Sequence, residues 1–156
     1  MTKPTIDDLE VLTPDQLRVL LHYEVKQASP DVQHIKDLIA VGCPIDFNDE
    51  FNSTPLHWLN TMWPLELLEL FLSNGVEINS MDKSGRTALH RAVVKGNLRI
   101  VEFLVSRGAQ VSIRDSFFKN ALDYAITQGD PDMVDFIRSR RPRVGGILAF
   151  LPMSTG

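Results

Sequence analysis

Thr87-Ala88-Leu89-His90 sets the architecture of this chain, because related tetrapeptides stand 33 residues away on both sides. The preceding copy is Thr54-Pro55-Leu56-His57, and the following, more divergent copy is Asn120-Ala121-Leu122-Asp123. Three glycines recur at the same interval, namely Gly42, Gly75 and Gly108. A fixed period of this length, with a turn and two short helices per step, is typical of a stacked solenoid. Because a solenoid offers an extended face and not an enclosed cleft, the sequence favours binding over catalysis.

Two columns of apolar residues indicate how the repeats pack. The first column contains Ile35, Leu68, Val101 and Val134, and the second contains Leu38, Phe71, Leu104 and Ile137. Residues three apart share one face of a helix, so each repeat predicts a helix whose apolar stripe is covered by the next repeat. The recurring glycines follow these stripes, where a left-handed residue ends a helix at little steric cost.

A polar turn follows each glycine and predicts a hairpin finger, as in Val76-Glu77-Ile78-Asn79 and the residues after it. Three aspartates share one register in these turns, namely Asp49, Asp82 and Asp115. A short carboxylate in a turn can accept hydrogen bonds from nearby backbone N–H groups. Phe118 occupies the slot of Gly85 in the last finger, so we expect that turn to take a different shape, whereas Asn52 is a smaller departure.

The stretch from Asp82 to Ala92 resembles the ankyrin repeat most closely, and the resemblance extends over roughly residues 31–140. It implies an all-α solenoid of stacked helix-turn-helix units with β-hairpin fingers. It also implies that the threonine and histidine of each helix opening bond to each other and to the backbone of neighbouring turns. With the helix-ending glycines, the structural residues of the motif are then Thr54, His57, Gly75, Thr87, His90 and Gly108.

The predicted organisation is an ankyrin-repeat domain over residues 1–144 followed by an apolar tail over residues 145–156. Residues 1–45 form a diverged N-terminal capping repeat, residues 46–78 and 79–111 form repeats two and three, and residues 112–144 form repeat four with the C-terminal cap. In the first of these, Thr13-Pro14-Asp15-Gln16 has the pattern of an N-cap, a first-turn proline and a capping-box glutamine. A second helix is expected from Ser29-Pro30-Asp31 to Gly42.

The C-terminal tail contains Ile147-Leu148-Ala149-Phe150-Leu151-Pro152-Met153, which water would solvate poorly. Folding back over the open end of repeat four is the favoured fate. Docking into a partner or into another copy of the chain comes second. A membrane contact is the least favoured, helped by a cluster of basic residues, namely Arg138, Arg140, Arg141 and Arg143.

The resemblance implies that a partner protein binds a concave surface formed by the finger tips and the exposed side of the first helix in each repeat. The candidate contact residues are Phe51, Met62, Trp63, Met81, Lys83, Arg86, Val94, Lys95, Arg114, Phe117 and Lys119. Several are apolar, and aromatic, Met and Arg side chains are enriched at interface centres. Trp63 precedes Pro64 in the turn between two helices, so partial exposure is expected. Against this, isolated exposed apolar residues are normal, and Phe117 and Phe118 could pack on their own turn.

Composition and motifs argue against other classes of function. The chain has 156 residues, a net charge of −4 and no broad basic field, so nucleic acid is not an expected partner. The single cysteine, Cys43, permits no intrachain disulfide and is expected to be a buried apolar residue. The four histidines form no metal or catalytic pattern with other residues, so no catalytic residue, metal or cofactor is expected. Without a signal or membrane span, we expect a cytosolic protein, with the nucleus or a host cell as alternatives.

The expected function is that of a non-enzymatic adaptor or inhibitor that occupies a surface of its partner. One alternative is a pathogen effector that acts on a host protein. Another makes the chain a substrate, because Glu77-Ile78-Asn79 resembles the acidic-aliphatic-asparagine signature of an asparagine hydroxylase. The competing interpretation of Asn79, favoured here, is that its side chain holds the turn in place.

Overall fold

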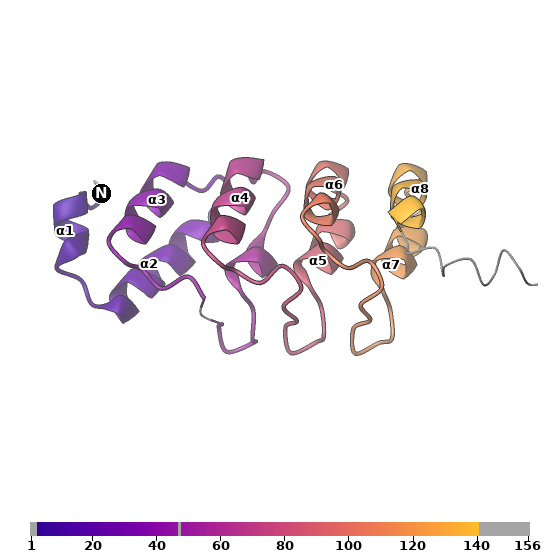
Figure 1. Cartoon of the computed structure of the whole chain (residues 1–156), viewed down its shortest axis with the longest axis horizontal. Helices are drawn as coiled ribbons and strands as arrows, with labels where there is room; N and C mark the ends of the chain where they lie inside the picture. Colours follow the sequence, from indigo (N-terminus) through magenta and orange to yellow (C-terminus); the bar gives the residue numbers. More distant parts are fainter. Residues whose placement is uncertain (1–2, 47, 141–156) are drawn as a thin grey trace, which may run out of the picture.

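The structure is a computed structural model that describes residues 3–46 and 48–140. Its helices are α1 (Ile6–Glu10), α2 (Pro14–Val25), α3 (Val32–Ala40), the 3-10 turn η1 (Pro55–Trp58), α4 (Leu65–Ser73), α5 (Ala88–Val94), α6 (Leu98–Ser106), α7 (Ala121–Gln128) and α8 (Pro131–Arg140). They stack as successive pairs into an elongated array, and three loops project from the same side (Figure 1). The all-α solenoid is thereby confirmed. The described ranges contain no strand, so the expected hairpins are hydrogen-bonded turns, called fingers below.

The array has two rows of helices. α2, η1, α5 and α7 form one row on the side of the fingers, called the inner row, and α3, α4, α6 and α8 form the outer row (Figure 1). α5 packs against η1 and α7 within its row and against α6 of the outer row. This stacking buries both apolar columns almost entirely, with Leu68, Phe71, Val101 and Leu104 all at 0% exposure. Burial of one such side chain contributes about 1.5–3 kcal/mol to folding.

Val134 is only half-buried, unlike the earlier members of its column. It lies on α8, the last described helix, and no later helix in the described chain covers that face. The apolar tail over residues 145–156, its three possible fates and the basic residues Arg141 and Arg143 lie outside the described residues. None of the helices that the structure describes is long and apolar enough to cross a membrane.

The N-terminal unit begins with a helix that the sequence analysis did not predict. α1 buries Leu9 completely, and Thr5 caps it by accepting a hydrogen bond from Asp8 N. The predicted start of α2 is confirmed, since Thr13 accepts from Gln16 N at 3.3 Å while the Gln16 side chain accepts from Thr13 N at 2.9 Å. These caps satisfy N–H groups that a helix end leaves without a partner.

Repeat two departs from the expected pair of α-helices. Its inner helix is reduced to η1, and the chain leaves helical geometry at Leu59, which has φ −48° and ψ 143°. Asn60 explains the early end, because its side chain accepts from Met62 N at 2.7 Å and donates to Gln27 O at 3.1 Å. Such local side-chain bonds compete with helix formation.

Because η1 ends early, Trp63 lies in the core and not in an exposed turn. In the loop after Asn60, Thr61 and Met62 are exposed, but Trp63 is only 3% exposed, with its ring tilted against Phe71 at a centroid distance of 6.0 Å. The expectation that Trp63 is partly exposed was therefore wrong. Its large ring is part of the apolar core of the array.

The last finger keeps the shape of the others, contrary to the expectation from Phe118. Phe118 has φ 59°, close to the 58° of Asn52 and the 72° of Gly85 in the same slot. Left-handed backbone is uncommon for a bulky residue. The hydrogen bonds of the finger thus impose this conformation on a residue that disfavours it.

Candidate functional site

Each finger is folded around the carboxylate of one aspartate, which is buried in the last two fingers and half-buried in the first. In the central finger, Asp82 Oδ1 accepts from Ser84 N at 2.8 Å and from Arg86 N at 3.0 Å. The turn is closed by the bond from Asp82 N to Arg86 O, at 2.9 Å. Asp49 and Asp115 repeat this arrangement in the other two fingers. The predicted role of these aspartates is confirmed, and the side chains at the tips are not needed to fold the turn.

A further side-chain bond ties each aspartate to the inner row. Asp82 Oδ2 accepts from Arg91 Nη2 at 2.7 Å, and Asp115 Oδ2 accepts from the Tyr124 hydroxyl. Trp58 hydrogen-bonds Asp49 from the equivalent position. Burial raises the pKa of the Asp82 carboxyl, but the bonds from Arg91 and the backbone outweigh this effect and leave its pKa below the ordinary value. The carboxylate therefore stays ionised and keeps its bonds.

The histidines of the repeat motif connect each inner helix to the following finger. His90 Nδ1 accepts from Thr87 N at 3.1 Å and lies 2.9 Å from Thr87 Oγ1. His90 Nε2 therefore carries the proton and donates to Lys119 O at 3.2 Å, because a carbonyl only accepts. His57 makes the same bonds to Thr54 and to Arg86 O. The structure thus shows directly the hydrogen bonds that the resemblance implied.

These histidine rings are held neutral. Burial lowers the pKa of both His57 and His90, and it outweighs the bonds to the carbonyls of Arg86 and Lys119, which raise it. Both ring nitrogens are occupied by this bonding, so neither histidine is available as a base or a metal ligand.

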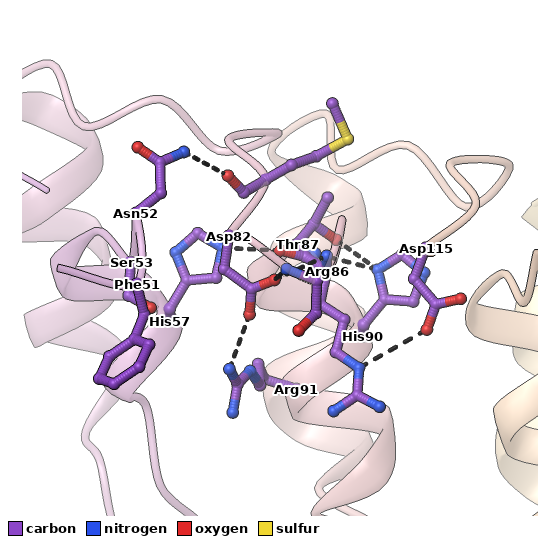
Figure 2. A network of polar contacts seen from close by, with 12 residues as sticks. Phe51, Asn52, Ser53, His57, Asp82, Arg86, Thr87, His90, Arg91 and Asp115 are labelled. Atoms are coloured by element: carbon purple, nitrogen blue, oxygen red, sulfur yellow. Dashed lines mark hydrogen bonds and ion pairs between the residues drawn. The ribbon is translucent and has the colours of Figure 1, made fainter. Parts of the chain in front are cut away.

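The fingers are also bonded to one another, which makes them a continuous row. Lys83 N donates to Phe51 O and Ser116 N donates to Ser84 O, both at 2.9 Å. Asn52 Nδ2 adds a bond to Met81 O at 2.8 Å, which Figure 2 shows beside the aspartate and histidine contacts. A row braced in this way presents its exposed side chains in fixed positions.

Most of the predicted contact residues lie on the exposed side of this row. Phe51, Met81 and Phe117 project from the fingers. Met62 lies in the loop after η1, and Val94 is the last residue of α5. All five side chains are exposed. The exposed basic residues are Lys83, Lys95, Arg114 and Lys119. Arg86 is half-buried, because its guanidinium bonds the Tyr124 hydroxyl at 3.2 Å and lies 3.5 Å from Asp115 Oδ2. Trp63 lies in the core and does not belong to this face.

Phe118 is an exposed residue that the candidate set left out. Packing of Phe117 and Phe118 on their own turn was one expectation, but their exposures are 66% and 79%. Two adjacent phenylalanines at the tip of the last finger were a signal for a contact site that the sequence already contained. We give the name finger face to the predicted contact residues other than Trp63, together with Phe118, namely Phe51, Met62, Met81, Lys83, Arg86, Val94, Lys95, Arg114, Phe117, Phe118 and Lys119.

Asn79 is bound at both ends of its side chain by the following repeat. Its Nδ2 donates to Gly108 O at 3.2 Å, and its Oδ1 accepts from Gln110 N at 2.9 Å. This geometry agrees with a structural role that holds the turn, the interpretation that the sequence analysis favoured.

The described residues contain neither a candidate metal site nor an ionised thiol. Over residues 3–46 and 48–140 there is no cluster of three or more His, Cys, Asp or Glu residues that could hold a metal ion. Cys43 is buried, and burial raises the pKa of its thiol to about 11, so it is protonated at neutral pH.

Comparison with protein families agrees with this geometry. A family model described as ankyrin repeats (3 copies) matches residues 21–115 and again residues 64–144. No curated protein gives a significant match to the sequence. The two matches cover most of the chain, and the chain therefore belongs to the ankyrin-repeat family.

Proposed function

We propose that this chain binds a partner protein through the finger face and acts as an adaptor or inhibitor by occupying a surface of that partner. Ankyrin repeats are in general non-enzymatic protein–protein interaction modules. The observation that supports this face is its row of exposed aromatic, methionine and basic side chains on a braced backbone. These residue types are enriched at the centres of interfaces.

The rigidity of the fingers supports the same proposal. Because backbone bonds link the three fingers, little conformational freedom is lost when a partner binds, and preorganisation of this kind strengthens affinity. The apolar members Phe51, Met62 and Phe117 are each 60% exposed or more, so burying them against a partner removes a substantial apolar area from water.

Affinity capture with matched variants tests the proposal. The face variant carries Phe51→Ser, Val94→Ser and Phe117→Ser, and the control carries Val11→Ser, an 81% exposed apolar residue outside the finger face. A captured protein counts as a partner only when it binds this chain after both proteins have been purified. We expect the face variant to lose at least about tenfold in affinity and the control to bind as the unmodified chain does. Equal binding by the face variant would place the interface elsewhere.

A further inference from the structure

We infer that the finger face binds an acidic segment of the partner protein, and that this segment also carries aromatic or large aliphatic side chains. The tip of the last finger is the main contact. This inference rests on the proposed function and narrows it to one kind of partner. It starts from Phe118 and from the charge around it.

Phe118 combines an unfavourable backbone with an exposed ring. Its φ of 59° lies in the left-handed region, where the equivalent residues of the other fingers are Asn52 and Gly85, which tolerate it better. The ring is 79% exposed, so packing within the described chain does not compensate for the strain. Strained residues of this kind concentrate at functional sites. A role in contact with another molecule accounts for a phenylalanine at this position.

Each phenylalanine of the tip has a contact with an arginine. Arg114 Nη1 donates to Phe118 O at 2.6 Å, across the base of the turn. The Arg86 guanidinium lies 6.0 Å from the centroid of the Phe117 ring. The backbone below is fixed by the bond from Ser116 N to Ser84 O. The backbone of the pair is therefore fixed before any partner arrives, and preorganisation of this kind strengthens binding.

The surroundings of the tip are basic. The last two fingers with α5 and α7, residues 79–95 and 112–128, contain six Lys or Arg and three Asp, although the whole chain has a net charge of −4. Two of those aspartates, Asp82 and Asp115, are buried in the finger turns. Lys83 and Lys119 are exposed and form no ion pair with any residue of the described chain. An acidic segment would be attracted to this region and repelled by the remainder of the surface.

Exposed rings beside cations also suit single-stranded nucleic acid, whose bases stack on aromatic side chains. The first finger argues against that ligand, because Asp46 and Glu50 are exposed there on the same row. A phosphate backbone lying along the fingers would meet these carboxylates, whereas a short peptide can end before them or pair a basic residue with them. We therefore favour a protein segment.

Selection from a display library of random linear peptides against the full chain provides the probe. We expect the enriched peptides to combine Asp or Glu with Phe, Trp or Leu. The affinity of a labelled synthetic peptide is then measured by fluorescence anisotropy. The decisive variant is Phe118→Gly, which removes the ring and the backbone strain together. It should keep or raise the melting temperature while losing about tenfold or more in affinity.

Charge reversal supplies the second arm. The double variant Lys83→Glu with Lys119→Glu should bind the acidic peptide more weakly. A second peptide, in which lysine replaces the acidic residues, should bind this variant better than it binds the unmodified chain. Val11→Ser is the matched control. Neutral or basic enriched peptides, or unchanged affinity in Phe118→Gly, overturn the inference. With either of these two results, peptides that still bind the finger face leave the proposed function standing, although the inference about an acidic segment fails. If the chain binds a labelled oligothymidine and Phe118→Gly abolishes that binding, the inference is overturned in favour of a nucleic-acid ligand.

Discussion

Replacement of Gly85 by alanine tests whether contact between fingers contributes to stability. Gly85 has φ +72°, and a Cβ atom built there lies 3.1 Å from both Asp115 Cα and Ser116 N of the next finger. Gly96 is a matched control, because its φ is +70° and its added Cβ meets nothing within 4 Å. Alanine in the left-handed region costs about 1 kcal/mol at either position, once the reduced freedom of the unfolded chain is counted.

The contact between fingers should add to this cost only at Gly85. Relief of the close approach requires the last finger to move away, which stretches the bond of 2.9 Å from Ser116 N to Ser84 O. Loss of one such hydrogen bond is worth about 1 kcal/mol. We expect Gly85→Ala to lower the free energy of unfolding by about 2 kcal/mol and Gly96→Ala by about 1 kcal/mol, measured by urea titration. Gly85→Asn separates the two contributions, since asparagine tolerates the backbone but still carries a Cβ. Equal losses in the two alanine variants would refute the reasoning.

Three further predictions follow from burial. Because the folded chain keeps His57 and His90 neutral with pKa values below the ordinary 6.5, the unfolded chain binds more protons in acid. The free energy of unfolding should therefore be at its full value above pH 6.5 and fall as the pH drops through the folded-state pKa values, and His90→Gln should flatten this dependence. Trp63→Ala should lower stability by about 3–5 kcal/mol in urea unfolding while leaving partner affinity unchanged per folded molecule. Cys43, with a pKa of about 11, should react with a thiol reagent in the native chain far more slowly than in the unfolded chain, and equal rates would contradict its burial.

The sequence predicted those parts of the fold that depend on regular spacing. The columns through Leu68 and Leu104 are buried because helix periodicity places them on one face, and the period between repeats puts them against their neighbours. The bonds of Asp82 were equally predictable, since a carboxylate in a tight turn has few other groups to bond. The turn bonds have a local cause, and the burial of the columns has a cause that recurs in every repeat.

The predictions that failed involve single residues whose conformation is set by the hydrogen bonds of their neighbours. Trp63 was placed in an exposed turn because its neighbours in sequence suggested one, but the bonds of Asn60 ended η1 early and turned the ring inward. Phe118 was expected to alter its finger, but the bonds around Asp115 held the turn in its usual shape. Hydrogen bonds made by neighbouring residues overrode the residue's own preference in each case.

The construction of the fingers explains why binding residues can vary on a fixed scaffold. Asp49, Asp82 and Asp115 fold the turns by accepting bonds from backbone N–H groups, which every residue except proline supplies. The side chains of Phe117 and Phe118 take no part in that bonding, so substitutions of these two residues leave the bonds to Asp115 intact. Phe117 and Phe118 are then free to be chosen for what they contact outside the chain. An exposed aromatic pair with a strained residue at Phe118 is thus best understood through the molecule it binds, since the finger would fold more easily with glycine in the place of Phe118.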